Sequence, residues 1–90
     1  MRERVRFRVR GHVQGIGYRY FVLETAERLR LAGWVRNLAD GDVEGEAEGE
    51  AADLQAFLEQ VRTAHPWARV DSLDKKDIPP IDQKGFRIAR

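Results

Sequence analysis

The sequence predicts an α+β fold in which two helices pack on one face of an antiparallel sheet. Three observations support this fold: a strict alternation of charged and apolar residues near the N-terminus, two segments with apolar residues at helical spacing, and short strand-like runs around them. With 90 residues and 42% hydrophobic content, the chain can form one hydrophobic core but is too short for two. We therefore expect residues 1–90 to form a single domain.

The first half of the chain predicts a strand, a helix and a hairpin. Residues 4–10 alternate arginine with valine or phenylalanine, which is typical of a half-buried strand. Residues 18–31 carry apolar side chains at helical spacing and are soon followed by a glycine, which indicates a helix and its end. Residues 34–38 and 43–48 are β-like runs on either side of an Ala-Asp-Gly turn, so they predict a β-hairpin.

The second half predicts another helix and two further strands. Residues 54–61 have apolar side chains at the i, i+3, i+4, i+7 spacing of an amphipathic helix. We expect a strand from 68 to 73, a polar loop with prolines from Asp74 to Lys84, and a short terminal strand from 86 to 89. The first six of these elements have the order strand, helix, strand, strand, helix, strand, which is the split βαβ pattern of the ferredoxin-like fold.

In this topology the third strand lies antiparallel beside the first, so charged side chains of the two strands should face one another on the solvent side of the sheet. The arginines are Arg4, Arg6, Arg8 and Arg10, and the carboxylates are Glu44, Glu46 and Glu48. Exposed cross-strand ion pairs contribute only about 0.2 to 1 kcal/mol each. We therefore expect these ion pairs to determine the register of the two strands and to add little to the stability of the fold.

The start of the first predicted helix lacks the residues that normally cap a helix. The segment 17–20 offers no Ser, Thr, Asp or Asn to accept the free amides, and Arg19 places a cation against the helix dipole. The preceding segment, 11–17, reads Gly-His-Val-Gln-Gly-Ile-Gly and can aim backbone N–H groups at an anion. A phosphate cradle and a plain glycine-capped helix with a surface arginine are both compatible with these residues. The spacing matches neither a Walker loop nor the Gly-x-Gly-x-x-Gly motif.

Asn37, the only asparagine, lies near the end of the second predicted strand. A right-handed crossover returns this strand parallel to the first, so the C-terminal ends of both strands lie at the same edge of the sheet and Asn37 neighbours the glycine loop. A neutral amide there can hold a water molecule, because it donates and accepts hydrogen bonds without titrating. Spacing alone favours the other interpretation, a strand-end asparagine that serves the following turn.

Four segments of the chain share their pattern with a known family. They are Gly-His-Val-Gln-Gly-Ile-Gly-Tyr-Arg at 11–19, Gly-Trp-Val-Arg-Asn at 33–37, Asp-Gly-Asp-Val-Glu at 40–44 and Phe-x-Ile at 86–88. Together they resemble the acylphosphatase family over nearly the whole chain. The resemblance implies hydrolysis of the carboxyl–phosphate bond of small acyl phosphates, giving a carboxylate and inorganic phosphate, without a metal or another cofactor.

The resemblance also implies the site residues. The phosphate-binding arginine of the family corresponds to Arg19 and its water-orienting asparagine to Asn37, and these two are the catalytic residues. The phosphate-binding loop then comprises Val13, Gln14, Gly15, Ile16, Gly17, Tyr18 and Arg19. No residue of this set is an obvious base, so the substrate's own phosphate is expected to take the proton of the attacking water.

The chain departs mildly from the family pattern. Ile16 and Tyr18 stand where valine and phenylalanine are commoner, and His65-Pro66 replaces the usual Gly-Pro. None of these positions is catalytic, and we expect His65 to be a helix-end or turn residue rather than a ligand. The segment from Asp74 to Lys84 has no clear family pattern, so its contacts with substrate stay unassigned.

Composition argues against several other classes of protein. The chain has no cysteine, one serine and two histidines, which argues against disulfides, thiolate zinc sites, nucleophilic triads and histidine-rich metal sites. The net charge is +1, and there is neither an apolar run of membrane-spanning length nor a signal-peptide pattern. We therefore expect a cytoplasmic protein that binds neither membranes nor nucleic acid. A monomer is a further expectation, which does not follow from charge or hydropathy.

Two other functions are compatible with parts of the sequence. Ferredoxin-like sheets also bind RNA, but such a surface needs basic and aromatic residues on the third strand, where this chain carries glutamates, and Phe7 falls on the apolar face. Acylphosphatase-like domains also occur within larger carbamoyl-transfer proteins that mature hydrogenases, so a noncatalytic phosphate-binding module stays open.

Overall fold

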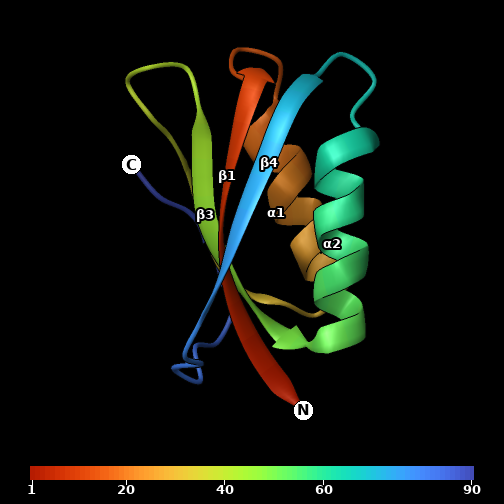
Figure 1. The fold of residues 1–90 in the computed structure, drawn as a ribbon, viewed down its shortest axis with the longest axis vertical. Helices are drawn as coiled ribbons and strands as arrows, with labels where there is room; N and C mark the ends of the chain where they lie inside the picture. The colour runs from red at the N-terminus through yellow and green to blue at the C-terminus, as the bar shows by residue number, and fades with distance from the viewer.

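The computed structural model describes all 90 residues and shows a sheet with two helices on one face (Figure 1). The elements in chain order are β1 (Arg2–His12), α1 (Tyr18–Arg28), β2 (Ala32–Asn37), β3 (Val43–Glu50), α2 (Ala51–Thr63), β4 (Arg69–Ile78) and β5 (Phe86–Ile88). The arrangement confirms the predicted α+β fold. Neither helix is long and apolar enough to cross a membrane.

The sheet has five strands in the order β4-β1-β3-β2-β5. Strand β1 pairs antiparallel with β3 and β4, and β2 pairs antiparallel with β3, as the ferredoxin-like topology predicts. Strand β5 pairs parallel with β2, so the sheet is mixed and the expectation of a wholly antiparallel sheet is wrong. The reason is that β4 already occupies the place beside β1, so the terminal strand adds to the opposite edge.

Strand β4 is longer than the sequence indicates. The expected loop from Asp74 to Lys84 is wrong in its first part, because β4 continues to Ile78, which pairs with Arg4 of β1. As an edge strand with most residues exposed, β4 accommodates polar side chains without the apolar alternation that would reveal it. Two prolines follow and end the pairing, since proline lacks the backbone N–H that a sheet requires.

Other boundaries shift by a few residues. Helix α1 ends at Arg28 rather than at Leu31, because Arg30 adopts a left-handed φ of 59° that a helix cannot include. Strands β1 and β3 are longer than the predicted ranges, 4–10 and 43–48, because pairing continues past the residues that alternate. Helix α2 follows β3 directly and carries Asp53 in its first turn, where the helix dipole favours a carboxylate.

The hydrophobic core lies between the sheet and the two helices. Val5, Phe7 and Val9 of β1 are buried in it, as their alternation predicts. The ring of Phe7 meets that of Phe57 on α2 edge to face, with centroids 5.4 Å apart. Gly45 of β3 lies opposite Phe7, and its missing side chain leaves room for the ring. Strand β1, which lies between β4 and β3, is therefore anchored by its apolar face.

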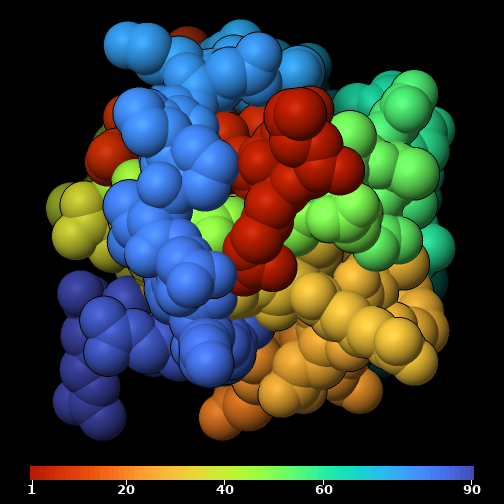
Figure 2. Space-filling model, turned by 90° about the horizontal axis from the view of Figure 1, so that it is seen from below, coloured from red at the N-terminus to blue at the C-terminus, as the bar shows by residue number.

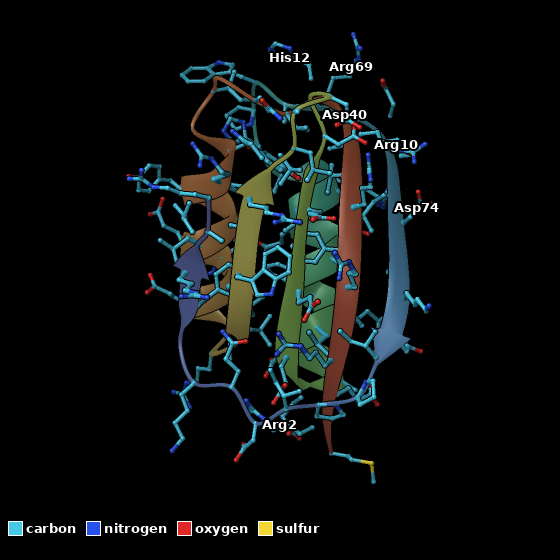
Figure 3. The ribbon with its side chains drawn as sticks, turned by 90° about the vertical axis from the view of Figure 1, so that its left-hand side faces the viewer. Arg2, Arg10, His12, Asp40, Arg69 and Asp74 are labelled. Carbon is cyan, nitrogen blue, oxygen red and sulfur yellow. The ribbon has the colours of Figure 1, made fainter.

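The outer face of the sheet carries the predicted arginine–glutamate pairs, and Figure 3 looks onto it, with Arg10 and Asp40 near one end and Arg2 near the other. The register sets Arg4 opposite Glu48, Arg6 opposite Glu46 and Arg8 opposite Glu44. Salt bridges of 2.7 to 3.4 Å connect Arg4 and Arg6 with these glutamates. Arg8 and Arg10 depart from the expectation, because Arg8 pairs with Asp40 and Asp42 of the β2–β3 turn at 2.6 and 2.8 Å, and Arg10 pairs with Asp42 at 3.4 Å.

One part of this face is buried, so the expectation of a fully solvated surface is wrong there. The side chains of Arg4 and Glu48 are 2% and 0% exposed, and a salt bridge of 3.0 Å joins them. The Ile81 N–H donates to Glu48 at 2.9 Å, and the Gln83 side chain accepts from Arg4 at 3.0 Å. Figure 2 shows this C-terminal segment lying beside the first residues of β1. The segment between β4 and β5 therefore covers the ion pair.

The environment of Glu48 predicts a loss of stability in acid. Burial alone would raise the pKa of this carboxyl, but hydrogen bonds from the Ile81 amide, Arg4 and Arg2 outweigh it and lower the pKa from 4.5 to about 2. Because the folded pKa lies below the unfolded one, the stabilisation is complete above the unfolded pKa of 4.5 and is lost as the pH falls toward 2. The parent should lose roughly 3 kcal/mol more than Glu48→Gln over this interval.

Urea unfolding followed by circular dichroism at a series of pH values measures this difference. The comparison with Glu48→Gln isolates one carboxyl from the others that titrate in the same range, since only this group is removed. Parallel pH profiles for the two proteins would show that Glu48 does not supply the acid-sensitive stability.

Candidate functional site

Three connections lie at the same end of the molecule, at the top of Figure 1. They are the β1–α1 loop at 13–17, the β2–β3 turn at 38–42 and the α2–β4 turn at 64–68. Strands β1 and β2 are both antiparallel to β3, so they run parallel to each other and end at this edge. A right-handed crossover between the two strands, as expected from the sequence, produces this arrangement.

The β1–α1 loop adopts a conformation that requires glycine. Gly15 and Gly17 have φ angles of 78° and 74°, in the left-handed region that other residues rarely adopt. Gly17 is the N-cap of α1 without a side-chain hydrogen bond, and the first turn contains no acidic residue. The first helical hydrogen bond runs from the Phe21 amide to the Gly17 carbonyl, so the amides before Phe21 have no helical acceptor. Helix α1 therefore begins as an uncapped, electropositive terminus.

The loop and this helix terminus line a cavity of about 220 Å³. Its lining residues are Val13, Gln14, Gly15, Gly17, Tyr18, Arg19, Tyr20 and Asn37. Ile16 is the one predicted loop residue outside this lining, because its side chain packs partly buried against the core. A second hollow of about 520 Å³ shares Arg19, Tyr20 and Asn37 and is completed by Ile88, Ala89 and Arg90. The two hollows adjoin at the predicted catalytic residues.

Arg19 is a cation without a partner in the chain. Every arginine of β1 is paired with a carboxylate, whereas Arg19 stands in a first helical turn that has no acidic residue. Its side chain is partly exposed and lines both hollows. The guanidinium and the helix dipole therefore both favour an anion at this place.

Asn37 is the last residue of β2, where pairing with Val43 of β3 fixes its backbone. Its side-chain oxygen is buried and accepts no hydrogen bond from the protein. The following turn does not use Asn37, because Asp40 accepts the Asp42 amide at 2.9 Å and backbone bonds complete the turn. Since buried polar groups are almost always paired, the Asn37 oxygen is available to a bound water or substrate.

Gln14 connects the loop to the β2–β3 turn. Its side-chain amide donates to the carbonyls of Leu38 and Asp42, both at 2.9 Å. These bonds hold the loop against the residues that follow Asn37, so the spacing between loop and asparagine is set by the protein itself. Sequence reasoning identified Gln14 only as a loop member, because its partners are carbonyl groups of a distant segment.

Tyr18 fastens the start of α1 to the end of α2. Its hydroxyl donates to the Val61 carbonyl at 2.6 Å, and the residue is 1% exposed. Val61 lies in the last turn of α2, where carbonyls have no helical partner, so the hydroxyl satisfies one of them. Burial raises the pKa of Tyr18 above its ordinary value, so the hydroxyl stays protonated. Tyr18 stands where phenylalanine is commoner in the family pattern, and its additional hydroxyl makes this hydrogen bond to α2.

Tyr18→Phe should lower the free energy of unfolding by about 1 to 3 kcal/mol, because a buried carbonyl is left without a donor. Urea unfolding of variant and parent measures the difference. Thr63→Ala is a matched control, since its hydroxyl donates to the Glu59 carbonyl at 2.8 Å at an exposed position where water can replace it. If Tyr18→Phe were as stable as the parent, the buried hydrogen bond would contribute nothing.

Fold and site define a ferredoxin-like α+β domain with an electropositive cavity at a helix N-terminus. The sequence model of the acylphosphatase family matches residues 5–88. An acylphosphatase from Moorella thermoacetica is 45% identical over 94% of this chain and 91% of its own length. The crystal structure of acylphosphatase from Bacillus subtilis is 38% identical, with a TM-score of 0.94 and full coverage of both chains. The chain belongs to the acylphosphatase family and is a hydrolase of acyl phosphates, which confirms the resemblance.

The same fold also occurs within a larger protein. The crystal structure of HypF from T. kodakarensis matches 98% of this chain at 36% identity, with a TM-score of 0.86. The match covers only 12% of the HypF chain. The relatives from M. thermoacetica and B. subtilis, by contrast, are matched over nearly their whole length.

Proposed function

We propose that residues 13–19 bind the phosphoryl group of an acyl phosphate and that Asn37 holds the attacking water, with residues 1–90 acting as one domain and without a metal ion. The observation that carries this proposal is the buried, unpaired side-chain oxygen of Asn37 in the cavity that Arg19 also lines. The uncapped start of α1 borders the same cavity. These groups supply the two things that the reaction requires, an anion site and a held nucleophile.

The anion site combines the loop amides, the α1 dipole and the guanidinium of Arg19. A guanidinium can donate to two phosphate oxygens at once, and the fixed amides add donors without a side chain to order. Charge spreads over the phosphoryl oxygens in the transition state, so donors already in place stabilise it with little reorganisation. Arg19 therefore contributes to both binding and turnover.

Asn37 supplies the acceptor that orients the water. Its side-chain oxygen accepts a hydrogen bond from the water, which leaves a lone pair of the water oxygen directed at phosphorus. The new P–O bond forms as the P–O bond to the acyl group breaks, and the carboxylate leaves with that electron pair. The water's proton passes to a phosphoryl oxygen, because no aspartate or glutamate lines either hollow. A carboxylate is a weakly basic leaving group, so it needs no proton to depart.

The second hollow is the place for the acyl group. It adjoins the phosphate cavity at Arg19 and Asn37 and offers the surfaces of Tyr20, Ile88 and Ala89. The segment from Asp74 to Lys84, which the sequence left unassigned, lines neither hollow. Acyl selectivity is therefore expected to depend on Tyr20 and the end of β5 rather than on that segment.

Hydrolysis of benzoyl phosphate in excess chelator, followed by its ultraviolet absorbance, tests this function. Turnover that persists with chelator present supports a metal-free reaction, whereas loss of turnover that a divalent cation restores would overturn it. No turnover from a folded protein that still binds inorganic phosphate would favour the noncatalytic binding module. Circular dichroism reports whether the protein is folded.

We further propose that the enzyme works as a cytoplasmic monomer that does not bind nucleic acid. The outer face of the sheet supports the last point, because the arginines of β1 are already paired with carboxylates. The guanidinium carbons of Arg36 and Arg6 lie 5.4 and 5.9 Å from the ring centre of Trp34, so this aromatic ring already has cationic partners. Light scattering after size-exclusion chromatography measures the oligomeric state, and titration with single-stranded RNA tests nucleic-acid binding.

A further inference from the structure

We infer that His65 is a positioning residue, whose side chain orients the Ile16–Gly17 peptide of the loop so that the Gly17 amide points at the bound phosphoryl group. This inference rests on the proposed function. His65 belongs to the turn between α2 and β4, as the sequence predicts, but its ring reaches the loop that begins α1. It also stands where the family pattern has a glycine, which has no side chain to make this contact.

Two hydrogen bonds determine which ring nitrogen of His65 carries the proton. The Trp67 N–H donates to His65 Nδ1 at 3.1 Å, so Nδ1 is the accepting, unprotonated nitrogen. In the neutral ring the proton then lies on Nε2, which is 3.1 Å from the Ile16 carbonyl oxygen. The turn after α2 thereby selects the tautomer that donates to the phosphate loop.

The geometry of the peptide unit between Ile16 and Gly17 determines the direction of the Gly17 N–H. The C=O and N–H of a planar trans peptide point in opposite directions, and the chain has no cis peptide. An Ile16 carbonyl directed at His65 therefore directs the Gly17 N–H away from it. Gly17 lines the phosphate cavity, whereas Ile16 does not. The hydrogen bond from His65 thus presents one loop amide to the anion.

The ring of His65 is itself held in place by aromatic neighbours. Its centroid lies 5.2 Å from that of Phe21, 5.9 Å from that of Tyr18 and 6.2 Å from that of Trp67. Tyr18 is bonded to Val61, so the end of α2 and its following turn hold the loop at two separate points. A donor supported in this way positions a site better than a mobile side chain would.

Two substitutions separate the hydrogen bond from the packing. His65→Phe keeps a ring among the aromatic neighbours but has no donor for the Ile16 carbonyl. His65→Gln lacks the ring but carries an amide that can reach the place of Nε2. Phenylalanine also lacks an acceptor for the Trp67 N–H. The two variants therefore differ in the ring and in the donor to the Ile16 carbonyl, and better phosphate binding by His65→Gln in spite of the lost ring would report the donor.

We expect His65→Phe to bind inorganic phosphate about tenfold more weakly than the parent, which corresponds to the loss of one well-made hydrogen bond. KM for benzoyl phosphate should rise by a similar factor with kcat little changed, because the Gly17 amide contacts the phosphoryl group before and during the reaction. His65→Gln should recover most of the affinity. Phosphate titrations that follow the Gly17 amide signal by NMR measure binding directly, at a temperature where circular dichroism shows all variants folded.

Parent-like phosphate affinity in His65→Phe, or equal impairment of both variants, overturns the inference. Ring-nitrogen NMR of the parent adds a test without substitution, since a proton on Nδ1 instead of Nε2 would overturn it too. Arg19→Ala shows whether a negative result concerns the role of His65 alone or the proposed function as well. If the parent hydrolyses benzoyl phosphate and Arg19→Ala does not, only the role of His65 is in question; a parent that neither binds phosphate nor turns over overturns both.

Discussion

Arg19→Ala is expected to lower kcat/KM for benzoyl phosphate by about 1,000-fold or more and to weaken phosphate binding strongly, because an arginine on a transferring phosphoryl group contributes on this scale. Arg19 has no carboxylate partner in the chain, so its charge is available to the substrate. The phosphoryl group carries charge in both ground and transition states, and both effects should therefore appear. Initial rates and phosphate titrations on the purified variant measure them.

Arg30→Ala is the matched control for this substitution. It removes the same charge just beyond the opposite end of α1, outside both hollows of the site. Its activity should stay close to that of the parent, so a general effect of net charge would be recognised. Retention of phosphate affinity in Arg19→Ala would show that the loop amides bind the anion without this guanidinium.

Asn37→Ala is expected to lower kcat by about 100- to 1,000-fold, the usual loss when one positioned hydrogen-bonding group is removed from an active site. Phosphate affinity should change little, because the loop and Arg19 remain. The reason is that the buried side-chain oxygen of Asn37 holds the nucleophile rather than the phosphoryl group. Single-turnover rates and phosphate binding, measured on the same preparation, separate the two effects.

The structure makes a folding defect in Asn37→Ala easy to detect. The backbone of Asn37 pairs with Val43 and its side chain bonds to no other residue, so alanine should leave the thermal midpoint nearly unchanged. Full activity in this variant would rule out the water-holding role. Loss of both turnover and phosphate binding would instead place Asn37 in the anion site.

The two substitutions together distinguish an enzyme from a binding module. A module that only binds phosphate would respond to Arg19→Ala and show no turnover in any variant. An enzyme organised as proposed responds to Arg19→Ala in affinity and rate, and to Asn37→Ala in rate alone. This pattern depends on the position of the two residues at the junction of the two hollows.

The sequence by itself determined the features that depend on nearby residues. Alternation over 4–10 identifies the buried face of β1, because strand side chains point to opposite faces in turn. The glycines before α1 and the missing cap predict an uncapped helix start, which the structure contains. The roles of Arg19 and Asn37 came from the family resemblance, since spacing alone left both residues with an ordinary structural interpretation.

Only the tertiary structure decided the features that depend on distant segments. These include the parallel pairing of β5, the cover over Glu48, and the bonds that Tyr18 and His65 make across the end of α2. Alternation shows which side chains point outward, but it does not show whether another segment lies over them. A side chain that binds a distant carbonyl leaves no periodic signal, because backbone carbonyls are present at every residue.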